Sequence, residues 1–350
     1  MNLTVINYSM KPDSLVFSHQ RDVVAALATA FDSVTVFTTE CTSEALHKNI
    51  EIMRVPWKPA AILVNIYRIL RAIVPHLIKS RNQVVFTHMS DIHAALISPF
   101  TKLLGIRHVF WYAHAHNSKY LIWSSFFVSK IVSSTPGSCN LKINRRKIEF
   151  INQGIDVDLF PFIPKANNPL TSILYYGRLD SSKNIDVLMR IGKVLHLENP
   201  ECKLSIYGKS MTSESKEYMN ALKMQYSDFV ESGAIYIGGE LRRREISQIT
   251  HSHDFFVNLF SGSLDKTLIE STMMGMPVIT WNLEYCKQFG TWSHQDAHAS
   301  IDFILKEISH LRELGDVDLQ AELDRRYAYA QSHHSFDGWI AQLRRILGNQ

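Results

Sequence analysis

Residues 3–39, LTVINYSMKPDSLVFSHQRDVVAALATAFDSVTVFTT, contain the pattern that decides the fold. A short apolar run, LTVIN, leads through a loop into SHQRDVVAALATAF, in which apolar residues recur at helical spacing. A second β-branched run, SVTVFTT, follows directly. Continuous apolar strands joined through a helix are typical of a parallel sheet that is covered on both faces. The stretch therefore predicts a strand–helix–strand unit.

The same alternation continues along the chain and predicts an α/β protein of two doubly wound, Rossmann-like units. Strands are predicted at residues 3–7, 33–39, 49–55, 83–88, 107–114, 130–135, 147–154, 171–177, 203–208, 234–239, 254–260 and 277–282. Helices are predicted at residues 18–31, 60–80, 91–105, 184–198, 213–231, 240–250, 266–274, 299–314, 319–332 and 337–347.

Residues 156–172, DVDLFPFIPKANNPLTS, form the best boundary between the two units. They hold three prolines and two adjacent asparagines and have no helical or strand periodicity. We expect a first domain over residues 1–155, rejoined by a C-terminal helix at 335–350, and a second domain over 173–334. Ligands of such folds bind at the carboxyl ends of the strands, so a site is expected in a cleft between the two sheets.

Composition excludes several classes of protein. The chain has 350 residues, of which 46% are hydrophobic and 20% charged, as in globular proteins rather than disordered or fibrous ones. Its four cysteines are scattered and form no C-x-x-C pair, which argues against a disulfide framework or a zinc-thiolate site. No signal peptide and no apolar stretch of about 18 residues is evident, so we expect a reducing, cytoplasmic compartment.

The formal net charge of +4 conceals a difference between the halves. Residues 1–153 carry 17 Lys and Arg against 8 Asp and Glu, a net charge of +9, whereas residues 154–350 carry 20 against 25, a net charge of −5. A split of sign often means that one half meets an anionic partner, and solvated surface charge is the equal alternative.

The segment YYGRLDSSKNIDVLM, residues 175–189, places two cations at the end of a predicted strand. Gly177 allows a sharp turn, Arg178 follows it, and Lys183 precedes the next helix. Two cations beside a helix N-terminus suit a diphosphate, since Arg offers a planar fork and Lys a point charge. An ordinary loop with surface charges is the alternative.

The segment LFSGSLDKTLIESTMMGMPVIT, residues 259–280, predicts a strand, a loop of small residues that includes Ser263, a helix and a further strand. The backbone N–H groups of Lys266, Thr267 and Leu268 would lie in the first helical turn, available for a phosphate. Glu270, one turn later, is suited to accept hydrogen bonds from a ribose diol. Asp265 is expected to cap the helix rather than to act as a catalyst.

These segments resemble the nucleotide-sugar half of the family 4 retaining glycosyltransferases. That family has G-R-x-x-x-x-K after a strand and a helix ending in L-x-E-A-M-x-x-G-x-P-V-I. This chain has Gly177-Arg178 with Lys183, and LIESTMMGMPVI over residues 268–279. FWYAHAH, residues 110–116, and INQGIDVDLF, residues 151–160, resemble two further motifs of the family in the same order. The resemblance implies the two-domain GT-B fold.

One position departs from the family, which pairs two acidic residues eight positions apart. Counting back from Glu270 gives Gly262 instead of Glu, within the sequence Gly-Ser-Leu-Asp-Lys. This sequence is similar to a variant found in bacterial members that build surface polysaccharides. Lys266 then adds positive charge near the phosphates, and the role of the missing carboxylate is not assigned to Asp265.

The resemblance implies a retaining transfer from a nucleotide-diphosphate sugar. Charge would build on the leaving phosphate, with Arg178, Lys183 and the helix N-terminus as its stabilisers. The acceptor hydroxyl would attack from the front face and pass its proton to the donor phosphate. His114 would contact the donor sugar, and His116 is a weaker candidate. No metal or other cofactor is expected, since there is no D-x-D motif and the pairs His114/His116 and His251/His253 have no nearby third ligand.

The acceptor is expected to be a saccharide, lipid-linked, in the synthesis of O-antigen, capsule or exopolysaccharide. Ser14, Phe17 and His19 follow the first strand and are candidates to contact it, with helix entry and core packing as the alternative. Residues 58–81 mix five cations with many aliphatic residues. They fit either an anionic membrane surface at the inner face of the cytoplasmic membrane or an ordinary helix with a basic outer side.

Other functions stay open at this point. Loss of the first acidic residue favours a non-catalytic nucleotide-sugar-binding protein, and a nucleotide-sugar 2-epimerase has the same fold. Nucleic acid is not an expected partner, because the basic half has no recognition motif.

Overall fold

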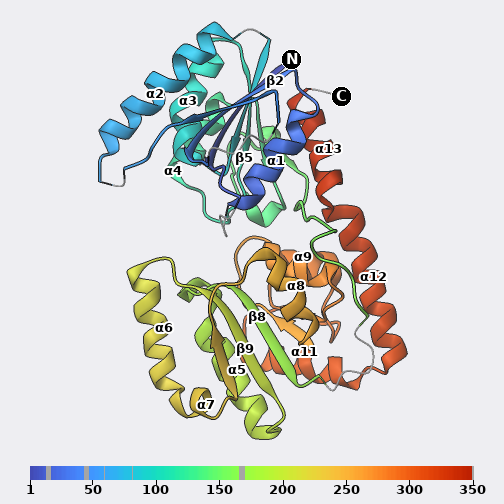
Figure 1. Ribbon diagram of the computed structural model, residues 1–350. Helices are drawn as coiled ribbons and strands as arrows, with labels where there is room; N and C mark the ends of the chain where they lie inside the picture. The colour runs from blue at the N-terminus through green and yellow to red at the C-terminus, as the bar shows by residue number, and fades with distance from the viewer. Residues whose placement is uncertain (13–16, 43–46, 59, 81, 165–169, 349–350) are drawn as a thin grey trace. The chain divides into compact units, whose positions relative to one another are not determined.

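The computed structural model describes residues 1–12, 17–42, 47–58, 60–80, 82–164 and 170–348. The chain forms two compact units. The first comprises Met1–Asn152 together with Asp337–Gln350, and the second comprises Gln153–Phe336. Figure 1 shows that each unit has its own sheet with helices packed around it.

The first unit is built on a seven-stranded sheet in the order β3-β2-β1-β4-β5-β6-β7, and all six strand pairs are parallel. β1, β2 and β4 are buried along almost their whole length because their runs of Val, Ile and Thr lie between helical layers. The strands are β1 (Asn2–Ser9), β2 (Ser33–Glu40), β3 (Ile50–Arg54), β4 (Gln83–His88), β5 (Arg107–Trp111), β6 (Lys130–Ser133) and β7 (Ile148–Phe150), and the helices are α1 (Ser18–Ala28), α2 (Ile62–Lys79), α3 (Asp91–Leu103), α4 (Lys119–Phe127) and α13 (Phe336–Leu347), with short 3₁₀ turns at Pro136–Ser138 and Arg145–Lys147.

The C-terminal helix α13 belongs to the first unit. Arg344 donates from Nη2 to the carbonyl oxygen of Ala26 in α1 at 2.6 Å. Arg107 donates from Nε to the carbonyl oxygen of Ile346 at 2.9 Å. The Trp339 ring lies 4.9 Å from that of Trp111, edge to face. These contacts pack the last helix of the chain against elements of its first third.

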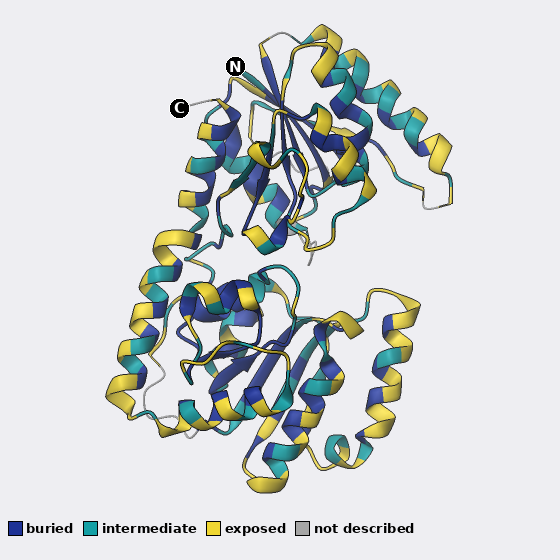
Figure 2. Ribbon diagram, turned by 180° about the vertical axis from the view of Figure 1, so that it is seen from behind, coloured by how far each residue is buried: buried dark blue, intermediate teal, exposed yellow. Residues whose placement is uncertain are grey.

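The second unit has a five-stranded parallel sheet in the order β10-β9-β8-β11-β12. Figure 2 shows its strands buried and the outer turns of its helices exposed. The strands are β8 (Ser172–Arg178), β9 (Lys203–Lys209), β10 (Ile235–Gly238), β11 (Phe255–Val257) and β12 (Val278–Ile279), and the helices are α5 (Ile185–Glu198), α6 (Ser213–Gln225), α7 (Ser227–Glu231), α8 (Arg243–His251), α9 (Lys266–Met273), α10 (Leu283–Phe289), α11 (Ile301–Glu313) and α12 (Asp316–His334), with a 3₁₀ turn at Ser181–Lys183.

The α/β prediction is confirmed, and several elements differ from it. The strand predicted over 107–114 ends at Trp111, so the histidines after it lie in a loop. The helix predicted over 213–231 is interrupted at Tyr226, whose ψ of 27° leaves the helical region. The strand predicted over 147–154 ends at Phe150, and helices α4 and α10 were not predicted at all. Among the described residues, no helix is long and apolar enough to cross a membrane.

Candidate functional site

The candidate site of the second unit lies at the carboxyl edge of its sheet, where β8, β11 and β12 are neighbours and end together. β8 and β9 reach this edge with Gly177 paired to Gly208. A Cβ added to Gly208 would lie 1.9 Å from the carbonyl oxygen of Gly177, so the two strand ends approach each other more closely than side chains would permit.

Arg178 ends β8 and remains accessible. Its side chain is 54% exposed, and Nη1 lies 3.5 Å from Oδ2 of Asp180. The Tyr175 hydroxyl donates to the carbonyl oxygen of Arg178 at 2.8 Å and thereby fixes the backbone of this residue. An exposed ion pair of this kind contributes little to stability, so the guanidinium is available for an anionic ligand.

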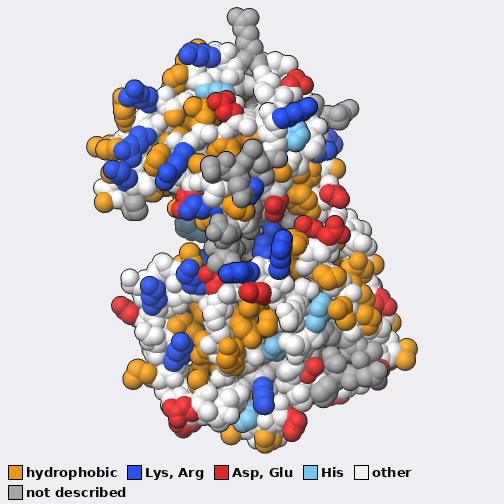
Figure 3. All heavy atoms as spheres, viewed as in Figure 1, with side chains coloured by type: hydrophobic (Ala, Val, Ile, Leu, Met, Phe, Trp, Pro, Cys, Tyr) orange, Lys and Arg blue, Asp and Glu red, His pale blue; other side chains and the backbone are white. Residues whose placement is uncertain are grey.

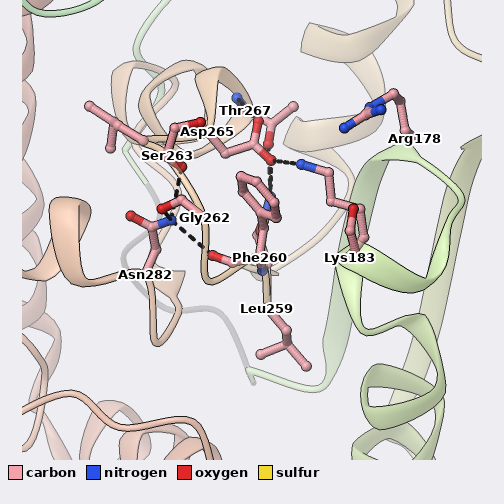
Figure 4. A network of polar contacts seen from close by, with 12 residues as sticks. Arg178, Lys183, Leu259, Phe260, Gly262, Ser263, Asp265, Thr267 and Asn282 are labelled. Atoms are coloured by element: carbon pink, nitrogen blue, oxygen red, sulfur yellow. Dashed lines mark hydrogen bonds and ion pairs between the residues drawn. The ribbon is translucent and has the colours of Figure 1, made fainter. Parts of the chain in front are cut away.

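Lys183 is held very differently, although it lies only five residues later. It closes the 3₁₀ turn Ser181–Lys183, which the Asp180 side chain caps, and it is buried. Its Nζ donates to Oδ2 of Asp265 at 2.5 Å and lies 3.7 Å from the centre of the Phe260 ring (Figure 4). The lysine is therefore positioned by an anion and an aromatic face together.

Asp265 is the partner that connects this lysine to helix α9. Its carboxylate also accepts from Asn258 Nδ2 at 3.1 Å and from the backbone N–H of Thr267 at 3.4 Å, as the N-cap of the helix. Burial acts to raise the pKa of Asp265, but the charge of Lys183 and the three hydrogen bonds outweigh it and hold the pKa below its usual value. Asp265 is thus an ionised cap paired with a lysine from another loop.

This cap changes one expectation about the helix N-terminus. The N–H of Thr267 is bonded to the Asp265 side chain, and the N–H of Leu268 donates to the Asp265 carbonyl oxygen at 3.2 Å. These two groups, which were expected to be available for a phosphate, are occupied by the residue that begins the helix. A phosphate that bound there would have to compete with Asp265.

The loop before α9 is fixed by two asparagines that sequence reasoning missed. Asn282 donates from Nδ2 to the carbonyl oxygens of Phe260 at 2.8 Å and Ser263 at 3.1 Å. Asn258 accepts from the backbone N–H of Phe260 at 2.9 Å. Both asparagines are buried: Asn258 directly follows β11, and Asn282 lies three residues after β12, as the N-cap of α10. An asparagine near the carboxyl end of a predicted strand was the signal available in the sequence.

Gly262 now has a physical explanation. A Cβ at this position would lie 2.3 Å from the tip of the Phe260 ring. That ring is the one that covers the Lys183 ammonium, and a side chain at position 262 would force it to move. The departure from the family pattern at Gly262 therefore accommodates Phe260 over the lysine.

Glu270 and Leu268 lie one turn into α9. Leu268 is fully buried in the hydrophobic core, so only its backbone is placed near the site. Glu270 is 6% exposed. Burial raises its pKa, and the positive charges of Lys266 and Arg243 act in the opposite direction. A buried carboxylate next to two cations is suited to accept hydrogen bonds from hydroxyl groups of a ligand.

The remaining candidates belong to the first unit and lie after β1 and β5, which end at the same edge of its sheet. The Phe17 ring lies 4.8 Å from that of Tyr8, and the His19 ring lies 5.4 Å from that of His88. His114 is exposed, with its ring 5.2 Å from that of Tyr112. His116 is exposed, and its carbonyl oxygen accepts a hydrogen bond from the Tyr112 hydroxyl. Ser14 lies outside the described residues.

His114 and His116 lie in the loop after β5 rather than on a strand, because β5 ends at Trp111. In the parts of the chain that the structure describes, no three or more His, Cys, Asp or Glu side chains are grouped so as to hold a metal ion.

Comparison with known proteins agrees with this architecture. Residues 171–291 match the family model described as Glycosyl transferases group 1. No curated protein matches the chain.

Several solved structures share the whole fold at low sequence identity. Anabaena Alr3699/HepE in complex with UDP-glucose is 14% identical, with a TM-score of 0.76 and 100% of both chains covered. Sucrose-phosphate synthase from Thermosynechococcus elongatus is 12% identical, with a TM-score of 0.75 over 99% of this chain and 98% of that one. A glycosyltransferase from Rickettsia africae is 15% identical, with a TM-score of 0.73 over 100% and 99%. Residues 171–291 thus match the group 1 glycosyltransferase model, within a chain that has the two-domain GT-B fold.

Proposed function

We propose that the protein is a retaining glycosyltransferase of the family 4 type, which moves a sugar from a nucleoside-diphosphate donor to a saccharide acceptor. The observation that carries the proposal is the pairing of Lys183 with Asp265 at the start of α9, 2.5 Å apart and beside Arg178, inside the matched domain. Solved structures of the same fold hold UDP, UDP-glucose, or UDP with GlcNAc. A donor with a diphosphate is the ligand that this set of cations suits.

The bond from the anomeric carbon to the diphosphate breaks in the proposed reaction, and negative charge builds on the leaving oxygen. Arg178 and Lys183 stabilise this charge electrostatically. The acceptor hydroxyl attacks from the face that the phosphate leaves and forms the new glycosidic bond. Its proton passes to the departing phosphate, so atoms and charge balance without an enzymatic nucleophile, and the chain's own cations take the place of a metal.

The proposed acceptor is a lipid-linked saccharide in the synthesis of a bacterial surface polysaccharide. This proposal rests on the resemblance of the Gly-Ser-Leu-Asp-Lys sequence and on the net charge of +9 in residues 1–153. Lipid-linked acceptors are presented at an anionic membrane surface, to which a basic domain is attracted. His114, Phe17, His19 and His116 are proposed to contact the sugar and the acceptor from the first unit.

The proposal is tested by screening UDP-, GDP- and other nucleotide sugars for thermal stabilisation of the full chain, followed by incubation of each hit. We expect one donor to raise the melting temperature and to be hydrolysed slowly without acceptor, with the free sugar keeping its anomeric configuration by NMR. Inversion of the configuration would overturn the retaining mechanism. A hit that is bound but left intact would favour a binding protein, and one converted to its 2-epimer would favour an epimerase.

Glu270→Gln tests the proposed contact to the ribose. Replacing the carboxylate by an amide removes a charge-assisted acceptor, so we expect nucleotide affinity to fall by about 5- to 30-fold. Isothermal titration with the nucleoside diphosphate identified in the screen measures the change. Glu217→Gln, an exposed position on α6, is the matched control. An unchanged dissociation constant in Glu270→Gln would remove the ribose role.

A further inference from the structure

Helix α4 buries Leu121 on its inner side, but it buries both of its serines there as well and exposes large apolar side chains. Its two serines, Ser124 and Ser125, are completely buried, whereas Ile122, Trp123 and Phe126 are 39%, 51% and 55% exposed. The serine hydroxyls are satisfied within the helix, because each donates to a backbone carbonyl oxygen at 2.7 Å. A surface helix of a globular protein normally does the opposite and turns its large apolar side chains inward.

Helix α2 exposes large apolar side chains among its cations. Its inner side packs Ile69, Ile73 and Leu77 into the core of the first unit. Its outer side still exposes Leu63 by 81% and Ile78 by 64%, with the Tyr67 ring between them. A helix with a buried apolar side and an outer side that mixes exposed apolar residues with Lys and Arg is typical of one that lies on a membrane surface.

Helix α3 lies between these two helices and packs against both, so the outer sides of all three form one surface. The Trp123 Nε1 of α4 donates to the carbonyl oxygen of Ala95 in α3 at 3.1 Å. Leu103, at the end of α3, is 84% exposed. We call this surface the α2–α4 face, and its exposed apolar side chains are Leu63, Tyr67, Ile78, Leu103, Ile122, Trp123 and Phe126.

The α2–α4 face is also almost free of acidic residues. Residues 52–148 contain 14 Lys and Arg but a single acid, Asp91, whose carboxylate accepts from the Ser118 hydroxyl at the start of α4 at 2.7 Å. Figure 3 shows Lys and Arg side chains interspersed with hydrophobic ones over the part of the first unit where Figure 1 draws α2. The exposed cations of the face are Lys58, Arg71, Lys79, Lys102 and Lys119, and in the described parts of the chain none of them forms a salt bridge.

We propose that the α2–α4 face docks on the surface of an anionic lipid bilayer. Exposed aliphatic and aromatic side chains reach the boundary between headgroups and acyl chains, and the surrounding cations meet lipid phosphates. A nucleic acid would use the cations but would leave Leu63, Ile78 and Leu103 without a partner. The inference rests on the proposed function, which brings the basic first unit to an anionic membrane, and deepens it by assigning the face that docks. Binding to lipid needs neither donor nor acceptor, so it is measured separately from sugar transfer.

Flotation of the full chain with vesicles tests the proposal. We expect binding to vesicles that contain about equal parts of phosphatidylglycerol and phosphatidylcholine, and binding to phosphatidylcholine alone that is weaker by about tenfold or more. Most of the binding should be lost when NaCl is raised from about 50 to about 500 mM. Trp123→Ser with Phe126→Ser should weaken binding about tenfold or more, and Lys102→Glu with Lys119→Glu should do the same. Leu197→Ser with Met224→Ser, which changes two exposed apolar residues of the second unit, is the matched control.

Three results would overturn the proposal. The first is no flotation at low salt, and the second is equal binding by wild type and both variants of the face. The third is that vesicles are not bound at all, whereas the wild type self-associates or binds a single-stranded oligonucleotide and both variants lose that interaction. Transfer to a water-soluble acceptor should be unchanged in both variants, so a failure of lipid binding is distinguishable from a failure of the proposed function.

Discussion

Lys183→Ala is expected to lower kcat by about 10²- to 10³-fold. An effect of this size is typical when an enzyme loses one preorganised group that stabilises a developing negative charge. Lys183 is buried and aligned by Asp265 and Phe260, so no other side chain can replace its ammonium without rearrangement. Steady-state kinetics with the identified donor measure the effect. Lys209→Ala, which removes a lysine that is 58% exposed at the end of β9, is the control and should retain wild-type turnover.

The same substitution leaves the buried Asp265 carboxylate without its counter-charge, which typically costs about 3–5 kcal/mol of unfolding free energy. Combining Lys183→Ala with Asp265→Asn removes both charges and should restore much of that stability in urea denaturation. It should not restore kcat. Recovery of turnover in the double variant would show that the loss came from damage to the fold, and wild-type turnover in Lys183→Ala would exclude Lys183 from the chemistry.

Much of the fold was predictable because its strands are short apolar runs between segments of helical period. β4 was predicted to the residue, and β1, β2 and β3 to within two. Helix α4 was missed because its sequence, KYLIWSSFF, has apolar residues on every side and therefore no 3.6-residue period. Its serines face inward, which is the reverse of the pattern on which such a prediction depends.

The candidate site was predictable one residue at a time but not as an arrangement. Strand ends and small-residue loops indicated Arg178, Lys183 and Asp265 separately. Lys183 and Asp265 are 82 positions apart, and no spacing rule connects them. Asp265 both caps α9 and pairs with Lys183, and this follows only from the fact that β8 and β11 are neighbours in the sheet.

Gly262 illustrates the same limit. In the sequence it was recognisable only as a missing carboxylate, which argued for a protein without catalytic activity. In the structure it is the position whose missing side chain leaves room for the Phe260 ring. The ring lies on the Lys183 ammonium, and Asp265 bonds to the same nitrogen. The site is thus arranged around the lysine, and hydrolysis of the donor is the measurement that decides whether it is catalytic without the missing carboxylate.

Arg178→Ala is expected to lower kcat by about 10²- to 10³-fold and to change the unfolding free energy by at most about 1 kcal/mol. Its side chain is half exposed, and its pairing with Asp180 at 3.5 Å is worth at most about 1 kcal/mol, so the fold does not depend on it. Arg178→Lys should recover only part of the turnover, because an ammonium cannot form the paired hydrogen bonds of a guanidinium to a phosphate.

The measurement for Arg178 separates kcat from KM and is repeated in urea denaturation. Arg190→Ala, an exposed arginine on α5, is the matched control and should behave as wild type in both. Because the charge that Arg178 meets is largest in the transition state, kcat should fall more than donor affinity does. A raised KM with unchanged kcat would make Arg178 a binding residue only, and equal kinetics in Arg178→Ala and Arg190→Ala would remove it from the site.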